Sequence, residues 1–260
     1  MPDSNTPTRP NVLVIAGHDP SGGAGIHADI EAVHAMGAHP CTLITGLTVQ
    51  NSINVTGFQL TDTTLLEQQA DALLDDLSFA AVKIGMTGSA AIIDMVARLL
   101  DRLPGVPVVL DPVLAAEAGG SLGEDTVPRA LLQQLFPKAA LVTPNLPEAQ
   151  ALAGAETIDA CGEALLDAGA LSVLVTGTHD NTPSVHNHLF MRSGTRRWET
   201  ARLPGSFHGS GCTLASACAA RLAFGDSLEQ AVDHAQAWVA KALEQAWQPG
   251  RGQLVPLRNG

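Results

Sequence analysis

The feature that most constrains the fold is a repeated alternation of short apolar runs with longer amphipathic segments. The run VLVIAG, which begins at Val12, predicts a buried strand, and residues 24–36 behind it have the spacing of a helix. The same succession recurs along most of the chain. Strands that alternate with helices favour an α/β fold with a mostly parallel central sheet, because each crossover helix packs back onto the sheet.

The remaining predicted elements share this pattern until the last third of the chain. Strands are predicted at CTLITGL (41–47), NVTGFQL (54–60), AAVKIGM (80–86), VPVVLDPV (106–113), ALVTPN (140–145) and LSVLVTG (171–177). Helices are predicted over 64–77, 90–103 and 127–135, between the last two strands, and in two final segments that begin near Gly211 and Leu228. Residues 185–203 instead predict an antiparallel hairpin that turns at Ser193–Gly194.

The length and the apolar content together predict one domain. The chain has 260 residues, of which 45% are hydrophobic, so one large core is within reach. No internal repeat and no linker is evident. We expect a poorly ordered tail over residues 1–10, which are polar and rich in proline, and a single domain over residues 11–260.

Charge and cysteine content exclude several classes of protein. The formal net charge is −12, and the three lysines are Lys83, Lys138 and Lys241, so the basic stripe of a nucleic-acid binder is missing. No apolar run reaches the length of a membrane span or of a signal-peptide core. The four cysteines are scattered and form no CxxC pair, which predicts neither a zinc site nor disulfides. A cytoplasmic protein without nucleic-acid or membrane partners is expected.

Polar and glycine residues follow the predicted strands. In open α/β sheets, ligands bind outside the carboxyl ends of the strands, so these residues mark a small-molecule site. They are Gly17-His18-Asp19, Gln50-Asn51, Gly85-Met86, Asp111-Pro112, Asn145-Leu146-Pro147-Glu148 and Thr176-Gly177.

The strongest single motif is HGSGCTLASACAARLA, which begins at His208. Gly209 and Gly211 flank Ser210 immediately before a long Ala-rich helix. Glycine lets the backbone approach an anion closely, and the N–H groups of the first helical turn point at it. The lysine of a P-loop is missing. The alternative is a glycine-rich turn that serves helix packing alone.

A second glycine-rich stretch, AGHDPSGGAGIHAD from Ala16, invites a dinucleotide-binding interpretation. It follows a predicted strand and opens a predicted helix. Its glycine spacing is not G-x-G-x-x-G, however, and no acidic residue ends the second strand to hold a ribose. An NAD-dependent oxidoreductase is therefore a distant alternative.

Six motifs in order carry a family resemblance: AGHDPSGGAGIHAD, LTVQN, VKIGM, LDPV, TPNLPEA and HGSGCTLASA. Together they resemble the hydroxymethylpyrimidine/phosphomethylpyrimidine kinases, over about Val12 to Gln253. The resemblance implies the ribokinase-like fold, with helices on both faces of the sheet, and a homodimer. It also implies ATP-dependent phosphorylation, in thiamine biosynthesis, of 4-amino-5-hydroxymethyl-2-methylpyrimidine and then of its monophosphate.

The same resemblance implies roles for the matching residues. The substrate pocket takes Gln50, Gly17, Asp29, Met86 and Val113, and the Gln50 amide offers the donor and the acceptor that an aminopyrimidine edge needs. The anion hole takes Gly209, Ser210 and Gly211. Magnesium and the phosphates take Asp111, Asn145 and Glu148, and the nucleotide takes Thr176 and Gly177.

Cys212 stands where most ribokinase relatives carry a catalytic aspartate. A helix N-terminus lowers the pKa of a thiol, so we expect Cys212 to be partly ionised and to accept the proton of the substrate hydroxyl. The alternative is that its side chain only fills space beside the substrate.

The chain departs from the family pattern at three places. Many members have lysine where this chain has Thr176, and His18 and His27 replace Ser or Thr and Gln. A pyridoxal or pyridoxine kinase of the same fold is the nearest alternative, since pyridoxal is also a flat heterocycle with a hydroxymethyl group. The missing lysine leaves open a catalytically weak pyrimidine-binding sensor.

Overall fold

The computed structural model describes residues 9–114, 122–177 and 182–259. Most of the predicted N-terminal tail lies outside these ranges. Within them, the strands are β1 (Asn11–His18), β2 (His39–Gln50), β3 (Val55–Leu60), β4 (Phe79–Ile84), β5 (Val108–Leu110), β6 (Leu141–Val142), β7 (Ser172–Thr176), β8 (Ser184–Met191) and β9 (Gly194–Ala201).

The strands form one sheet in the order β3-β2-β1-β4-β5-β6-β7-β8-β9. Strands β2, β1 and β4 to β7 are mutually parallel, so the predicted parallel sheet is confirmed. β3 pairs antiparallel at one edge, and β8 and β9 pair antiparallel at the other. All parallel strands therefore direct their carboxyl ends to the same edge of the sheet, where the predicted site residues lie.

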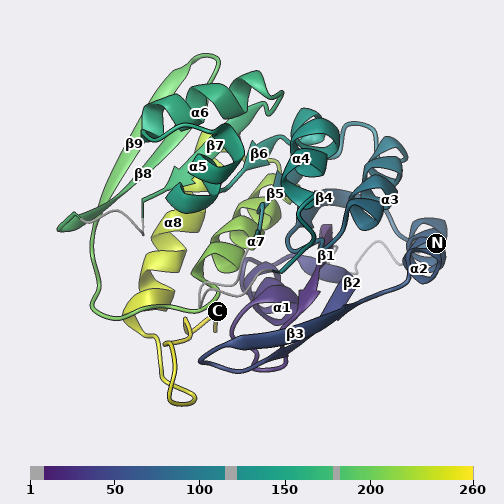
Figure 1. Cartoon of the computed structure of the whole chain (residues 1–260), viewed down its shortest axis with the longest axis horizontal. Helices are drawn as coiled ribbons and strands as arrows, with labels where there is room; N and C mark the ends of the chain where they lie inside the picture. The colour runs from purple at the N-terminus through teal and green to yellow at the C-terminus, as the bar shows by residue number, and fades with distance from the viewer. Residues whose placement is uncertain (1–8, 115–121, 178–181, 260) are drawn as a thin grey trace.

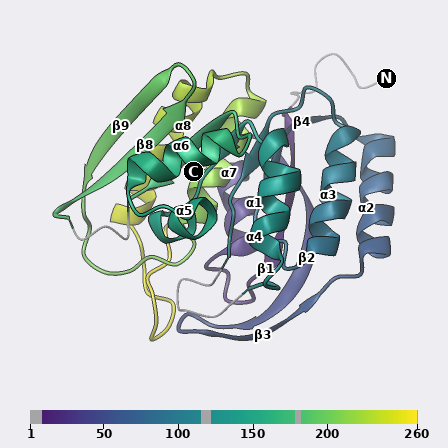
Figure 2. The same ribbon diagram turned by 45° about the horizontal axis from the view of Figure 1, so that its top comes forward.

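Helices cover both faces of the sheet (Figures 1 and 2). They are α1 (Gly25–Ala35), α2 (Thr63–Asp76), α3 (Ala90–Asp101), α4 (Val127–Ala130), α5 (Leu146–Ala153), α6 (Ile158–Asp167), α7 (Ser210–Ala223) and α8 (Leu228–Glu244). α4 continues as a π-helix (Leu131–Leu135) and a 3-10 turn (Phe136–Lys138).

The alternation of side chains along β1 shows how the sequence divides the core in two. Val12, Val14 and Ala16 pack into the cluster beneath α1, α7 and α8. Leu13 and Ile15 point to the opposite face and pack into the cluster beneath α2 to α6. Because both faces of a central parallel strand are covered, the strand reads as a continuous apolar run.

The antiparallel hairpin is confirmed, but its predicted turn is displaced by one residue. Met191 pairs with Gly194, so the turn residues are Arg192 and Ser193. Gly194 has φ 137°, a value outside the range that other residues readily adopt. Gly194 therefore lies just after the turn, as the first residue of β9.

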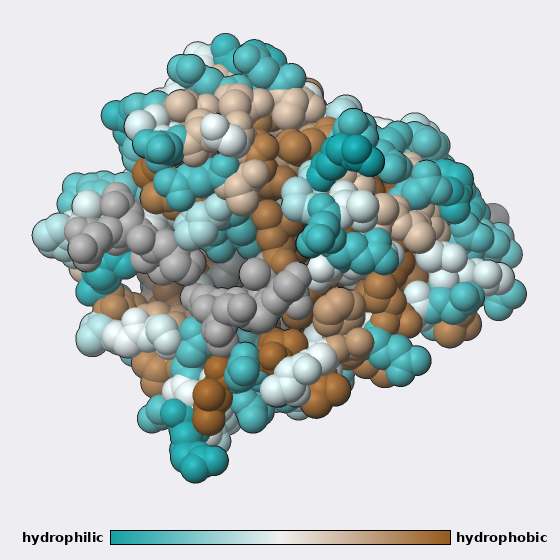
Figure 3. All heavy atoms as spheres, viewed as in Figure 1, coloured by the Kyte–Doolittle hydropathy of each residue, from teal (hydrophilic) through white to brown (hydrophobic). Residues whose placement is uncertain are grey.

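The surface is mixed in polarity. On the face shown in Figure 3, hydrophilic residues cover much of the rim, and apolar residues lie between them towards the middle. In the part of the chain that the structure describes, no helix has both the length and the apolar character needed to cross a bilayer.

Candidate active site at the carboxyl edge of the sheet

The predicted site residues lie along one edge of the sheet. Gln50 ends β2, Gly17 is the penultimate residue of β1, and Met86 follows β4. Asp111 follows β5, and Asn145 and Thr176 pair at the ends of β6 and β7. Residues separated by more than a hundred positions in the chain are therefore neighbours here.

Three of the predicted pocket residues come together around Met86. A side chain at position 17 would meet Met86 Sδ at 2.6 Å, so only glycine lets the thioether lie against β1. Val113 packs against the small cluster of Val55, Met86 and Leu122. These contacts form an apolar wall at the strand ends, of the kind that covers the face of a flat ligand.

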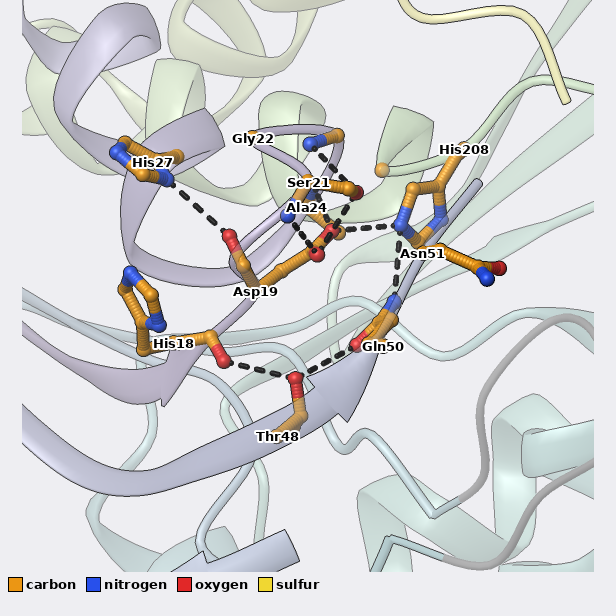
Figure 4. A network of polar contacts seen from close by, with 12 residues as sticks. His18, Asp19, Ser21, Gly22, Ala24, His27, Thr48, Gln50, Asn51 and His208 are labelled. Carbon is orange, nitrogen blue, oxygen red and sulfur yellow. Dashed lines mark hydrogen bonds and ion pairs between the residues drawn. The ribbon is translucent and has the colours of Figure 1, made fainter. Parts of the chain in front are cut away.

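A polar network is built on Asp19, two residues after Gly17 in the chain (Figure 4). Asp19 Oδ1 accepts hydrogen bonds from Ser21 N and Oγ, both at 2.8 Å, and Oδ2 accepts one from Ala24 N at 2.9 Å. His208 Nε2 lies 2.7 Å from the same Oδ2. Burial opposes ionisation of Asp19, but the hydrogen bonds from His208 and Ser21 outweigh it and hold the pKa of Asp19 below its usual value.

The neighbours of Gln50 determine how its amide is oriented. Thr48 Oγ1 lies 2.9 Å from His18 O and 3.0 Å from Gln50 Oε1, yet a hydroxyl has one proton to donate. His208 Nε2 lies 3.0 Å from Gln50 Nε2, yet a ring nitrogen that donates to Asp19 cannot also accept. Exchanging the amide oxygen and nitrogen removes both conflicts, and hydrogen bonding is the proper basis for this assignment.

With that orientation, the Gln50 amide donates to Thr48, and its carbonyl shares the His208 proton with Asp19. One amide N–H and one carbonyl lone pair remain for a ligand. Gln50 is half-buried, so this donor–acceptor edge is accessible from the strand ends.

A second polar cluster lies behind the wall and is closed to solvent. Lys83 and Asp29 are fully buried, and Lys83 Nζ donates to Asp29 Oδ1 at 2.8 Å. Ser216 Oγ donates to the same oxygen at 2.7 Å. Burial favours the neutral amine of Lys83, but the carboxylates of Asp29 and Asp111 outweigh it and raise the pKa of Lys83, so the ammonium persists. Asp29, predicted to line the pocket, is a buried ion-pair partner in α1.

Asp111 and Cys212 border this cluster. Asp111 Oδ2 lies 3.6 Å from Lys83 Nζ and makes no hydrogen bond with any described residue. Burial raises the pKa of the Asp111 carboxyl; Lys83 opposes the rise and Asp29 adds to it. Burial also raises the pKa of the Cys212 thiol; Lys83 opposes the rise, and Asp111 and Asp29 add to it. The direction of this shift is opposite to the thiolate expected at Cys212, because burial outweighs the interactions that favour ionisation.

The predicted anion hole has the expected backbone geometry. Gly209 is the N-terminal cap of α7 and has φ 75°. A side chain there would meet Gly23 O at 2.0 Å, so glycine is required both by conformation and by the close approach of the 19–25 loop. Gly211 has open space around its Cα and is exposed. The first turn of α7 thus presents its N–H groups at an accessible surface.

The predicted NxxE element has a clear local role. Asn145 Oδ1 accepts from Glu148 N at 2.9 Å, and Glu148 Oε2 accepts from Asn145 N at 3.0 Å, which makes a capping box at the start of α5. Thr176 N donates to Pro144 O at 2.9 Å, and Gly177 N donates to Asn187 Oδ1 at 3.1 Å. The predicted nucleotide residues therefore adjoin the capping box.

Sequence reasoning missed Lys83 as a site residue, and it placed Asp19 and His208 in candidate motifs without assigning either of them a role. Lys83 carried a signal, since it interrupts the apolar run AAVKIGM. A lysine in a strand that is buried on both faces needs a buried carboxylate partner. His208 stands directly before Gly209, but its contact with Asp19 joins positions 189 apart in sequence. Only the tertiary structure brings these two residues together.

This edge of the sheet offers hard oxygen ligands for a metal ion, but the described residues do not form a complete coordination shell. Among the described residues, no group of three or more His, Cys, Asp or Glu side chains could hold a metal ion. Asp111 Oδ2, which accepts no hydrogen bond from the described residues, is a ligand of the kind that Mg²⁺ prefers. This donor set suits an ion held largely by water and by phosphate oxygens.

Comparison with known proteins places these residues in context. Residues 19–257 match the family described as phosphomethylpyrimidine kinase. The hydroxymethylpyrimidine/phosphomethylpyrimidine kinase of Salmonella typhimurium is 38% identical over 245 residues, which are 92% of this chain and 92% of that protein.

Two solved structures are similar over almost the whole chain. The pyridoxal kinase of Staphylococcus aureus, in complex with AMP-PCP and pyridoxal, has a TM-score of 0.89 at 26% identity, covering 97% of this chain and 94% of that one. The phosphomethylpyrimidine kinase of Clostridium difficile has a TM-score of 0.79 at 30% identity, covering 90% and 100%. The ribokinase-like fold is thereby confirmed. The curated relative is a pyrimidine kinase, whereas the solved structures include a pyridoxal kinase and a pyrimidine kinase.

Proposed function

The chain is a kinase that belongs to the phosphomethylpyrimidine kinase family, and we propose that it phosphorylates 4-amino-5-hydroxymethyl-2-methylpyrimidine with ATP. The monophosphate would then be the acceptor of a second phosphoryl group, which yields the diphosphate used in thiamine biosynthesis. We place this reaction in the cytoplasm, where ATP is available.

The observation that carries the proposal is the convergence of an anion site and a hydrogen-bonding edge at one end of the sheet. Gly209 to Cys212 present the first-turn N–H groups of α7, and a phosphoryl group in transfer needs such preorganised donors. The Gln50 amide lies within the network that ends in His208, next to Gly209 in the chain. The same loop thus links acceptor recognition to the anion site.

The Gln50 edge suits an aminopyrimidine. Its free carbonyl lone pair can accept from the exocyclic amino group, and its free N–H can donate to the adjacent ring nitrogen. The apolar wall of Gly17, Met86 and Val113 would lie against the flat ring. Pyridoxal has no amino group beside a ring nitrogen, so this edge favours the pyrimidine.

Cys212 would line the acceptor site as a neutral thiol. Burial and its carboxylate neighbours keep its pKa raised, so proton acceptance by a pre-formed thiolate is not part of the proposal. Phosphoryl transfer depends mainly on positioning and on stabilisation of charge, which the α7 N-terminus and the Lys83 ammonium can provide.

Magnesium would be held near Asp111, with Asn145 and Glu148 ordering its water shell. When bound, the ion would neutralise charge on the phosphates of ATP. Thr176 and Gly177 adjoin the capping box and are proposed to face the nucleotide. Since Thr176 offers no cation, positive charge on that side would come from the metal.

A homodimer is proposed from the exposed face of the β2–β3 hairpin. Leu47 and Val49 alternate on β2 with exposed fractions of 54% and 65%, and β3 is an edge strand. Large apolar side chains beside an unpaired edge favour association with a second copy. Light scattering of the purified protein tests this, and a monomer at micromolar concentration would contradict it.

The function is tested by an assay with ATP, magnesium and the hydroxymethylpyrimidine, in which both mono- and diphosphate products are followed. Pyridoxal is assayed in parallel, because the structural likeness to a pyridoxal kinase makes it the specific rival. We expect a higher kcat/KM for the pyrimidine. A higher kcat/KM for pyridoxal would overturn the substrate assignment, and pyrimidine binding without turnover would identify a sensor.

A further inference from the structure

The C-terminal segment buries an arginine that the reaction outlined above does not use. The Arg258 side chain has no exposed surface, although it lies within three residues of the end of the chain. Burial of a charged group is costly unless hydrogen bonds and an ion pair compensate for it. The hydrogen-bond and ion-pair partners of Arg258 therefore identify the parts of the structure that this side chain holds together.

The guanidinium group joins the glycine-rich loop to two helices. Arg258 Nε donates to Thr213 Oγ1 in α7 at 2.8 Å, and Nη1 donates to Glu31 Oε2 in α1 at 3.0 Å. Nη2 donates to Gly23 O at 2.5 Å, and Nη1 approaches Gly22 O at 3.5 Å. A planar fork of donors can satisfy these divergent acceptors together, which a single ammonium cannot.

Thr213 extends this connection to the anion hole. Its Oγ1 donates to Gly209 O at 2.6 Å, so a chain of hydrogen bonds runs from Arg258 through Thr213 to Gly209. The backbones of Gly209 and Gly23 are themselves in close contact. The guanidinium thus holds, from behind, the two backbone segments that meet at the start of α7.

Backbone pairing brings Arg258 to this place. Leu257 N donates to Ala242 O at 2.9 Å, and His208 N donates to Leu254 O at 2.8 Å. The second bond ties the C-terminal segment to the residue that precedes Gly209. Two backbone hydrogen bonds therefore fix the part of the segment that leads into Arg258, at Leu254 and Leu257.

We propose that Arg258 is a positioning residue for phosphoryl transfer, which sets the backbone of Gly23 and Gly209 in the geometry of the anion hole. This inference rests on the proposed assignment of that hole, but it holds for either acceptor substrate. Loss of the guanidinium leaves the fold in place and displaces the anion-binding N–H groups. A small misplacement of this kind can lower catalysis by about 100-fold.

A cavity makes the proposal testable by chemical rescue. It has a volume of about 420 Å³, and its lining includes Ser21, Gly22, Glu31, Trp247 and Arg258. Truncation of Arg258 would extend this cavity towards Gly23 and Thr213. A free guanidinium ion can then enter from solvent and occupy the vacated position.

The experiment compares Arg258→Ala with Arg251→Ala, a matched control at an exposed arginine of the same segment. The acceptor is whichever of the pyrimidine and pyridoxal the parent enzyme phosphorylates, so failure of the proposed substrate is seen first and separately. Binding of AMP-PCP, measured by calorimetry, provides a second readout. We expect kcat/KM to fall by about 100-fold in Arg258→Ala and to stay within about twofold of the parent in the control.

Added guanidinium chloride, at concentrations that leave the parent folded, should restore Arg258→Ala by about tenfold or more, whereas ammonium chloride should not. Arg258→Lys should remain impaired, because its ammonium cannot reach the divergent acceptors. Parent-like activity in Arg258→Ala or in Arg258→Lys would overturn the proposal. So would a loss in folded Arg258→Ala that guanidinium leaves unchanged. If Arg258→Ala does not fold, the activity of folded Arg258→Lys decides the matter.

Discussion

Two buried aspartates at the same edge of the sheet have pKa values that are shifted in opposite directions. Asp19 lies in the loop after β1, and Asp111 follows β5, two strands away. Both are nearly inaccessible, with exposed fractions of 3% and 4%. The pKa of Asp19 is lowered, whereas that of Asp111 is raised. Burial alone therefore does not decide how a carboxylate behaves here.

The difference lies in the number of donors that each carboxylate receives. Asp19 accepts from Ser21, Ala24 and His208, which together favour its ionised form. Asp111 shares the Lys83 ammonium with Asp29, and its Oδ2 accepts no hydrogen bond from the described residues. The first region, the network around Asp19, therefore stabilises the fold. In the second region, the cluster of Asp111, Lys83 and Asp29, the charge on Asp111 destabilises the fold, as is common where residues serve chemistry.

The largest expected effect comes from Lys83→Met, which removes the cation that the second region depends on. Asp29 would remain buried with Ser216 as its hydrogen-bond donor. Breaking a buried ion pair in this way typically costs roughly 3–5 kcal/mol of the free energy of unfolding. Urea denaturation measures the loss, and we expect kinase activity to disappear with it.

The matched control is Lys138→Met. Lys138 pairs with Asp101 at the surface, where the carboxylate side chain is 66% exposed. Surface pairs of this kind contribute about 0–1 kcal/mol. Equal losses in the two variants would refute the difference between a buried and a solvated lysine on which the comparison rests.

The next effect separates the two aspartates directly. Asp19→Asn should lose roughly 1.5–3 kcal/mol at neutral pH, because hydrogen bonds to a charged group are lost. Asp111→Asn should be as stable as the parent or more stable, because the ionised carboxylate opposes folding. The variant should nevertheless be inactive, because Asp111 is the proposed ligand near magnesium. Thermal or urea unfolding at several pH values checks both signs.

The pH dependence follows from the directions of the two pKa shifts. The stabilisation by Asp19 is complete above the usual aspartate pKa of 3.8 and is lost as the pH falls through its lower folded value. The penalty from Asp111 is complete above its raised folded pKa and disappears as the pH falls to 3.8. A destabilised Asp111→Asn at neutral pH would contradict the proposed contrast.

A smaller effect is expected from Gln50→Leu, which tests the recognition role of the first region. The fold should survive, since Gln50 is only half-buried. Loss of hydrogen bonds to a bound pyrimidine should cost about 1–3 kcal/mol in transition-state binding, seen in kcat/KM. The same variant should change pyridoxal turnover much less. An unchanged kcat/KM for the pyrimidine would remove Gln50 from the site.

The smallest effect is expected from Cys212→Ser, which probes the border of the second region. Because the pKa of the thiol is raised, neither side chain is ionised near neutral pH. We expect activity within about tenfold of the parent, below the usual range for loss of a general base, and a ratio that does not change between acidic and alkaline assays. A deficit that grows with pH would restore the thiolate hypothesis.

Much of the fold and of the site's location was predictable from the sequence. A continuous apolar run such as VLVIAG indicates a strand that is buried on both faces, and this signal is local in the sequence. Residues such as Gly17, Asp111 and Asn145 could be placed at one edge, because parallel strands end together. The turn at Gly194 was displaced by one residue, because the register of a hairpin is set by pairing across both strands.

The sequence alone thus determined the mostly parallel α/β fold, the family and the edge of the sheet at which the candidate site residues lie. Only the tertiary structure decided the ionisation of Cys212, the partner of Lys83 and the use of Arg258. A pKa and a buried ion pair depend on groups brought together from distant parts of the chain, as in the contact of Lys83 with Asp29 across 54 positions. Local pattern carries no information about such neighbours, because electrostatic energy depends on distance in space and not on distance in sequence.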